Sequence, residues 1–154
     1  MTERSALIQQ VRLALRSMGT GVGRLNDVVG SFVDLKGADV EILDHIGFFG
    51  PVSPGELADA MHIHPATMTG ILDRLEDGGW VLRERSPDDR RKVHVKALRT
   101  RGPELVRLYA PMNDSLNRIC AELSEGQLRT VVEFLRSVSA AATDAATDLK
   151  RQNG

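Results

Sequence analysis

The chain has 154 residues, enough for one compact domain with a hydrophobic core. Hydrophobic residues make up 42% and charged residues 27%, a balance that excludes a disordered or membrane-embedded chain. No apolar run approaches the roughly 20 residues of a membrane span, and the N-terminus has no signal-peptide core. A cytoplasmic protein without a membrane partner is expected, and the single cysteine, Cys120, excludes an internal disulfide.

The formal net charge of -1 hides a basic island. Residues 83–101 contain eight basic and three acidic side chains, a net charge of +5, which leaves -6 for the rest of the chain. Such a local concentration is typical either of a surface that contacts phosphate or of a solvated, charged hairpin. Charge alone leaves both interpretations open.

The first part of the chain is predicted to be helical. Apolar residues recur at steps of three and four from residue 5 to 33, which predicts a long amphipathic helix, and a short helix is expected over 38–48. Ser53-Pro54-Gly55-Glu56 combines a capping serine, a first-turn proline and a capping-box glutamate, so a third helix begins there. A fourth helix begins at His64-Pro65 and ends at Gly78-Gly79.

The pattern then changes to strands. Residues 80–85 and 93–98 flank a polar turn and predict a hairpin with a basic tip, in which Trp80 is assigned to the core. Two helices follow, one over about 102–123 and one that begins at the capping box Ser124-Glu125-Gly126-Gln127. The predicted fold is mainly α with a small β-hairpin.

Two short helices joined by the tight link His62–Pro65 and followed by a hairpin indicate a winged helix-turn-helix. The residues that begin the second of these helices are short enough for close approach to a major groove, and a threonine hydroxyl can bond a base edge or a phosphate. The hairpin carries guanidinium groups suited to phosphates or to a narrow minor groove. The residues concerned are Ala66, Thr67, Thr69, Gly70, Arg90, Arg91 and Lys92.

The stretch from 53 to 102 resembles the winged helix-turn-helix of the MarR family of bacterial regulators. Its most specific pieces are Thr69–Glu76, Gly79-Trp80-Val81, Asp88–Arg91 and Gly102. The resemblance implies a homodimer, held together by its terminal helices, that binds pseudo-palindromic operator DNA. Many members are repressors that a small aromatic ligand releases from DNA.

By this resemblance, residues 1–154 form a single MarR-like domain. The DNA-binding lobe is expected at about 38–99, and the helical dimerisation region at about 5–33 and 100–152. Arg83 and Asp89 match the family's wing-supporting polar positions and are expected to pair, whereas Gly70 stands where many members have a basic residue. The expected DNA-binding residues are His64, Pro65, Ala66, Thr67, Thr69, Gly70, Arg74, Arg83, Arg85, Asp89, Arg90, Arg91 and Lys92.

An acidic stretch argues for a different class of protein. Residues 39–79 hold eight acidic side chains and one basic one, Arg74, so the acids must face away from phosphate or be paired internally. The amides at the start of the fourth helix are expected to remain free for a phosphate, with affinity resting largely on the wing. The alternative is a winged-helix protein-interaction module that does not bind DNA.

Four residues are candidates for an effector site, namely His45, Phe48, Phe49 and Met112. The two phenylalanines also fit plain core packing, and this alternative stays open. Cys120 lies in an apolar stripe, so a buried, inert thiol is favoured over an oxidant sensor. The histidines lack metal-ligand spacing except for the pair His62/His64, which brackets a turn and is expected to cap the helix or contact DNA. No catalytic constellation occurs either, so no metal, cofactor or enzymatic activity is expected.

Overall fold

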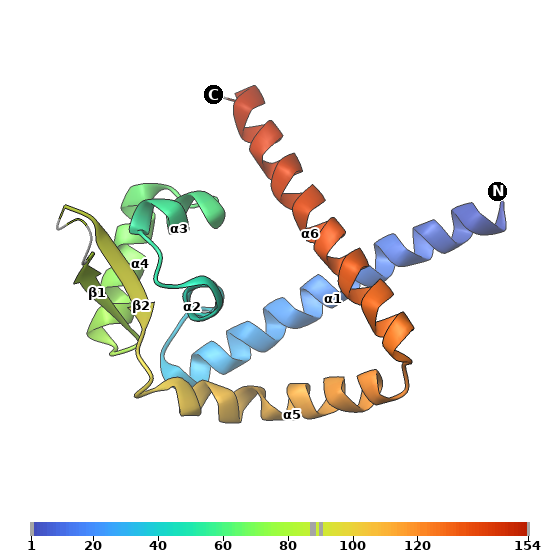
Figure 1. Cartoon of the computed structure of the whole chain (residues 1–154), viewed down its shortest axis with the longest axis horizontal. Helices are drawn as coiled ribbons and strands as arrows, with labels where there is room; N and C mark the ends of the chain where they lie inside the picture. Colours follow the sequence, from blue (N-terminus) through green and yellow to red (C-terminus); the bar gives the residue numbers. More distant parts are fainter. Residues whose placement is uncertain (1, 87–88, 90, 154) are drawn as a thin grey trace. The chain divides into compact units, whose positions relative to one another are not determined.

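The structure is a computed structural model that describes residues 2–86, 89 and 91–153 (Figure 1). The chain divides into two compact units, Met1–Leu108 and Tyr109–Gly154. In the described residues the elements are α1 (Glu3–Val33), α2 (Gly37–Phe49), α3 (Pro54–Ala60), α4 (Pro65–Asp77), β1 (Val81–Arg85), β2 (Val93–Ala97), α5 (Gly102–Ala121) and α6 (Glu125–Asn153). The predicted order of helices and strands is confirmed.

Local chemistry sets the predicted helix boundaries. The Ser53 hydroxyl accepts from the Glu56 amide at 3.2 Å and the Glu56 carboxylate accepts from the Ser53 amide at 2.9 Å, so the predicted capping box begins α3. Ser124 and Gln127 repeat this arrangement at the start of α6. The chain leaves α4 through Gly79, whose φ of 72° lies in the left-handed region that favours glycine.

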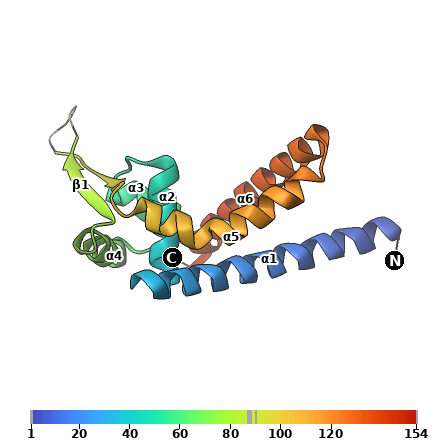
Figure 2. The same cartoon turned by 90° about the horizontal axis from the view of Figure 1, so that it is seen from below.

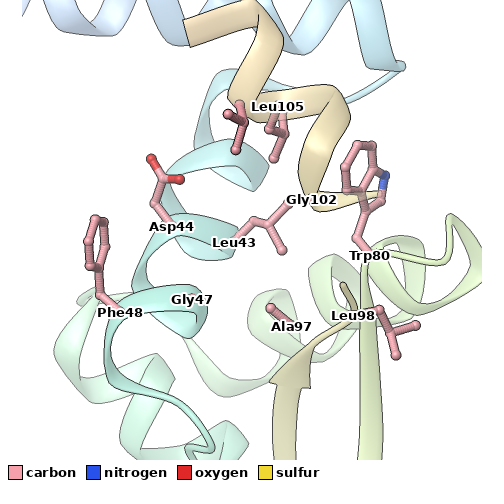
Figure 3. Close-up of a pocket in the computed structure, with 10 residues that line it drawn as sticks. Leu43, Asp44, Gly47, Phe48, Trp80, Ala97, Leu98, Gly102 and Leu105 are labelled. Atoms are coloured by element: carbon pink, nitrogen blue, oxygen red, sulfur yellow. The ribbon is translucent and has the colours of Figure 1, made fainter. Parts of the chain in front are cut away.

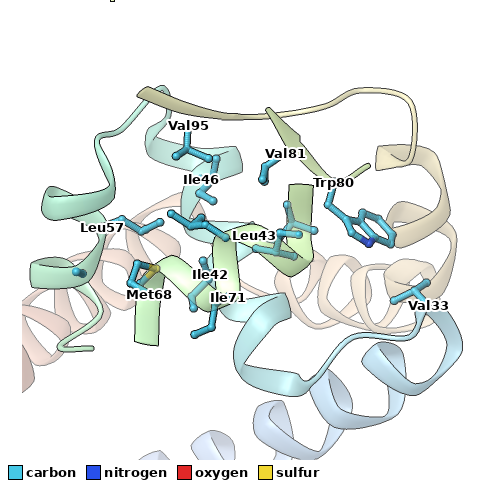
Figure 4. Packing of buried hydrophobic residues seen from close by; sticks show 13 residues of the cluster. Val33, Ile42, Leu43, Ile46, Leu57, Met68, Ile71, Trp80, Val81 and Val95 are labelled. Carbon is cyan, nitrogen blue, oxygen red and sulfur yellow. The ribbon is translucent and has the colours of Figure 1, made fainter. Parts of the chain in front are cut away.

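The first unit encloses one hydrophobic core between α2, α3, α4 and the hairpin (Figure 4). Trp80 is only 2% exposed, which confirms its assignment to the core. From α1, only the C-terminal end joins the buried residues, through Asn26, Val29, Gly30 and Val33. Most of the length of α1 therefore contributes nothing to this core.

The hairpin pairs β1 with β2 in antiparallel register, from Val81 opposite Ala97 to Arg85 opposite Val93. Val52 forms an isolated bridge with Val95, which fixes the loop between α2 and α3 to the hairpin. Val81 and Val95 are buried, whereas Arg85 and Val93, at the end of the strands nearest the tip, are exposed. Figures 1 and 2 show both strands beside α3 and α4. The hairpin is thus anchored at its base and open at its tip, as a wing is.

The second unit consists of the later part of α5 and all of α6. None of its residues from 109 to 149 is buried within the chain, although both helices are amphipathic. Its exposed large apolar side chains are Met112, Leu116, Ile119, Val131, Val132, Phe134, Leu135 and Leu149. Within the described part of the chain, no helix is long and apolar enough to cross a membrane.

Candidate nucleic-acid interface

Helix α4, here called the recognition helix, has one apolar and one small polar face. Met68, Ile71, Leu72 and Leu75 are buried in the core. The other face presents short side chains from the first turns of the helix, all exposed except the half-buried Gly70: Pro65, Ala66, Thr67, Thr69 and Gly70. Because no long side chain stands among them, this face can approach the floor of a groove closely.

The two threonines of this face differ in what their hydroxyls do. Thr69 donates its hydroxyl to the Pro65 carbonyl one turn earlier, at 3.0 Å. The Thr67 hydroxyl has no hydrogen-bond partner among the described residues. Thr67 is therefore free to donate to a base or a phosphate, whereas Thr69 retains only acceptor capacity.

The start of the recognition helix offers less to an anion than expected. Proline at position 65 has no amide hydrogen, and the Ala66 amide donates to Nδ1 of the capping His64 at 3.2 Å. Of the first three residues, only Thr67 keeps an uncommitted amide. The expectation of a free helix terminus for phosphate is corrected accordingly, and His64 acts as a cap.

The guanidinium of Arg74 is bound by groups of the protein itself, although the side chain is 49% exposed. Its Nη2 lies 2.8 Å from Oδ1 of Asp39, and its Nη1 donates to the Gly70 carbonyl at 3.2 Å. The Asp39 side chain is only 3% exposed, and leaving such a carboxylate unpaired would be costly. The guanidinium is thus committed to joining the recognition helix to α2, which disfavours the predicted contact with DNA.

Arg83 joins the wing to the recognition helix. Its guanidinium pairs with Asp73 at 2.7 Å and with Glu76 at 2.6 Å, and its backbone amide also donates to Glu76 at 3.0 Å. The expected pair between Arg83 and Asp89 is therefore wrong. At 23% exposure, the Arg83 side chain is better placed to fix the angle between β1 and α4 than to reach a phosphate.

These bonds lower the pKa of Glu76, because the Arg83 amide and then its guanidinium stabilise the ionised carboxylate. The pKa is lower in the folded than in the unfolded chain, so Glu76 stabilises the fold above its ordinary pKa. That contribution is lost as the pH falls through the folded-state value.

Glu76→Gln is therefore expected to lower the free energy of unfolding at pH 7, by on the order of 1 kcal/mol. The difference from the unsubstituted protein should shrink as the pH falls below about 4. Chemical denaturation at several pH values measures it. Glu125→Gln, which removes a 90% exposed carboxylate, is the control and should change stability by only a few tenths of a kcal/mol. A pH-independent deficit for Glu76→Gln would contradict the assignment.

The wing tip is shaped by Asp89. Its carboxylate accepts from the Arg91 amide at 3.0 Å and its carbonyl from the Lys92 amide at 2.9 Å. Asp89 is thus a turn-forming residue, and the predicted site residue Arg90 lies outside the described residues. Three cations of the hairpin, Arg85, Arg91 and Lys92, are exposed, and none forms an ion pair with a described residue.

Three acids around the recognition helix are neutralised from within. Asp39 is paired with Arg74, and Asp73 and Glu76 share Arg83, as the prediction of internal pairing requires. On the hairpin, Lys96 is likewise engaged by Glu84 at 2.6 Å. Within the hairpin, the positive charge that remains available to a phosphate consequently lies on Arg85, Arg91 and Lys92, toward the wing tip.

A separate pocket of about 280 Å³ lies between α2, the base of the wing and the start of α5 (Figure 3). Phe48 lines it and is 83% exposed. His45 and Phe49 do not line it, and their rings instead meet each other with centroids 4.7 Å apart. Since Phe49 is also 68% exposed, core packing of the two phenylalanines is wrong for the chain by itself.

Two predicted residues belong to the second unit. Met112 is exposed on α5, and its assignment to an effector site stays a prediction. Cys120 is half-buried within the chain, not fully buried as expected.

Asp39, the partner of Arg74, was not predicted as a residue of the interface. Its local signal was only that of a capping residue, because its carboxylate accepts from the Lys36 amide at 3.4 Å at the start of α2. Arg101 was not predicted either; its guanidinium lies 3.8 Å from the centre of the Trp80 ring and donates hydrogen bonds to Glu104 and to the Gly78 carbonyl. Both contacts join segments far apart in the sequence.

A model of the MarR family matches residues 37–93, from the start of α2 to the start of β2. The chain thus carries a MarR-family domain. It is 28% identical over 132 residues to the HTH-type transcriptional regulator YcgE of Bacillus subtilis, a match that covers 86% of both chains. It is 34% identical over 88 residues to the transcriptional repressor MprA of Escherichia coli, covering 56% of this chain and 49% of MprA.

The fold also agrees with this family. The structure is similar to that of FabT of Streptococcus pneumoniae in complex with DNA, with a TM-score of 0.67 and 24% identity over 90% of this chain and 99% of FabT. The protein is thus a MarR-family transcriptional regulator with a winged helix-turn-helix, and its relatives are regulators and not enzymes.

Proposed function

We propose that this MarR-family regulator is a cytoplasmic, homodimeric repressor that binds pseudo-palindromic operator DNA. The recognition helix would lie in the major groove, and the wing against the backbone or the minor groove. The observation that carries the proposal is the separation of charge in the first unit. The acids Asp39, Asp73 and Glu76 are paired internally, while Arg85, Arg91 and Lys92 have no such pairs.

A second copy of the chain is the partner that best accounts for the exposed apolar faces. The second unit has no buried residue from 109 to 149, and α1 leaves Leu7, Val11, Met18 and Val22 exposed. Amphipathic helices of this length need a covering surface to be stable in water. A two-fold dimer would cover both faces and present two recognition helices, which matches a palindromic operator.

The pocket between α2 and the wing supports the proposed release by a ligand. Ala97 and Leu98 at the base of the wing belong to its wall, together with Leu105 of α5. A molecule seated there would contact the element that carries the free cations. We infer that its binding shifts the wing and weakens the contact with DNA.

The alternative, a protein-interaction module, loses part of its support in the structure. It relied on the acidic balance of residues 39–79. Three of those acids are bound by Arg74 and Arg83, so they are not available as a negative docking surface. The exposed wing cations have no evident purpose in that alternative.

Thr67→Val tests the proposal at the base-reading step. The change keeps the side-chain shape and removes the free hydroxyl, so operator binding should fall about five- to tenfold relative to random DNA, on the order of 1 kcal/mol. The slope of log affinity against log salt should not change, because no charge is lost. Fluorescence anisotropy would compare duplexes from the DNA flanking the protein's own gene with random duplexes at several salt concentrations.

Thr69→Val is the matched control, because its hydroxyl proton already bonds the Pro65 carbonyl. It should change discrimination by less than about twofold. Equal weakening of both duplexes by Thr67→Val would assign its hydroxyl to a phosphate. Failure of the unsubstituted protein to bind any duplex at low salt would refute the proposed function.

A further inference from the structure

The pocket beside Trp80 has a single charged group in its lining. Nine of its ten lining residues are apolar or glycine, and the tenth is Asp44. Figure 3 shows Asp44 and Phe48 on one side of the pocket and Trp80 on the other, with Leu43 between them. A volume of about 280 Å³ lies near the lower end of the range for small-molecule sites, so it suits a ligand of one or two rings.

The charge of Asp44 is not balanced by the protein. No described residue forms an ion pair with Asp44, and Glu41 on the preceding turn of α2 adds a second negative charge. Asp44 is exposed in the single chain, yet its pKa is raised, first by partial desolvation and then by Glu41. Arg101, which covers the Trp80 ring, is already bound by Glu104. The walls of the pocket therefore favour a positive charge at the Asp44 side.

We propose that this pocket binds a small aromatic amine in its protonated form, with the ammonium group at Asp44 and the ring between Leu43, Leu105 and Trp80. The ring would replace water on apolar walls, and the ammonium would gain a charge-assisted hydrogen bond to an otherwise unpaired carboxylate. An aromatic carboxylate of the same size would meet Asp44 and Glu41 without any cation in the lining. This proposal rests on the proposed function, because the pocket is the effector site proposed there. It adds the chemical class of the ligand.

Trp80 supplies a direct readout, because it is the chain's one tryptophan and lines the pocket. The full-length protein would be titrated without DNA against three probes of matched shape, namely 2-phenylethylamine, 2-phenylethanol and 3-phenylpropionate. Tryptophan emission and calorimetry would both be recorded, so that a silent fluorescence response does not conceal binding. We expect the amine to bind at least about tenfold more tightly than the carboxylate, with the alcohol between them.

Asp44→Asn keeps the size of the side chain and removes its charge. It should weaken amine binding about tenfold and change alcohol binding by less than twofold. Glu41→Gln, which removes a charge outside the lining, is the control and should weaken amine binding by only about twofold. Carboxylate binding as tight as amine binding, an unchanged amine affinity in Asp44→Asn, or no binding of the amine at millimolar concentration would each overturn the proposal.

Comparing the amine titration with duplex affinities, measured separately with and without the amine, distinguishes this proposal from the proposed function. Amine binding that leaves duplex affinity unchanged would support the pocket assignment and refute its role in releasing DNA. Amine binding by a protein that binds no duplex would also support the assignment while refuting the repressor. Neither result depends on the other, because the titration contains no DNA.

Discussion

Replacing both Arg91 and Lys92 with alanine is expected to weaken binding to operator and random duplexes alike, by about tenfold or more at moderate salt. Both side chains are exposed, and neither has an ion pair among the described residues, so their charge is available to phosphates. If each neutralises one phosphate, the slope of log affinity against log salt falls by about 2 per monomer. Titrations of both duplexes at several salt concentrations measure the slope.

The control variant must also lose two positive charges, but from side chains that already form ion pairs within the protein. Lys96→Ala combined with Arg129→Ala does so, because Lys96 is paired with Glu84 at 2.6 Å and Arg129 with Glu125 at 3.6 Å. This variant should retain most of the affinity and nearly the full salt slope. If random-duplex binding survives the loss of Arg91 and Lys92, the wing is not the electrostatic anchor, and the protein-interaction alternative gains support.

The helix boundaries were predictable because the groups that set them are close in the sequence. Ser53 and Glu56 cap each other across three residues, and His64 caps the amide two residues later. The hairpin followed from the second strand, where Val93 and Val95 alternate with His94 and Lys96 directly after the polar turn. Such signals lie within a few residues of one another, so they act before any tertiary contact exists.

The electrostatics of the candidate interface were only partly predictable. Counting charges over residues 39–79 gives an acidic lobe, but it does not show that Arg74 reaches Asp39, 35 residues away. Nor does it show that Arg83 forms its ion pairs with Asp73 and Glu76 and not with Asp89. Long side chains have several partners within reach, and the packing of α4 against α2 and β1 selects among them.

The pocket could not be predicted for a similar reason. Its walls come from α2, the base of the wing and α5, and position along α2 does not show which side chains face them. Phe48 lines the pocket, whereas the next residue, Phe49, turns toward His45 one turn earlier. Adjacent residues of an α-helix point about 100° apart around its axis. The rotation of α2 about that axis therefore decides which of the two phenylalanines lines the pocket.

The largest effect on assembly is expected from Leu7→Glu combined with Val11→Glu. These side chains lie one turn apart on α1 and are 55% and 41% exposed in the single chain. If a second copy covers them, the double variant places four carboxylates per dimer in an apolar interface, a cost of several kcal/mol. Sedimentation velocity should show a monomer at concentrations where the unsubstituted chain is a dimer.

Substitution is a sharper test than deletion of α1, because Val29 and Val33 at its C-terminal end belong to the core of the first unit. The matched control is Gln9→Glu with Thr20→Glu, which adds two carboxylates to the opposite side of α1 and should remain dimeric. Emission from the buried Trp80 reports whether the first unit stays folded in each variant.

A folded dimer of the Leu7 and Val11 variant would show that this stripe is not the dimer interface. Loss of the dimer with normal Trp80 emission would identify α1 as part of it, and operator affinity should then fall as well, because two linked recognition helices bind a palindrome far more tightly than one.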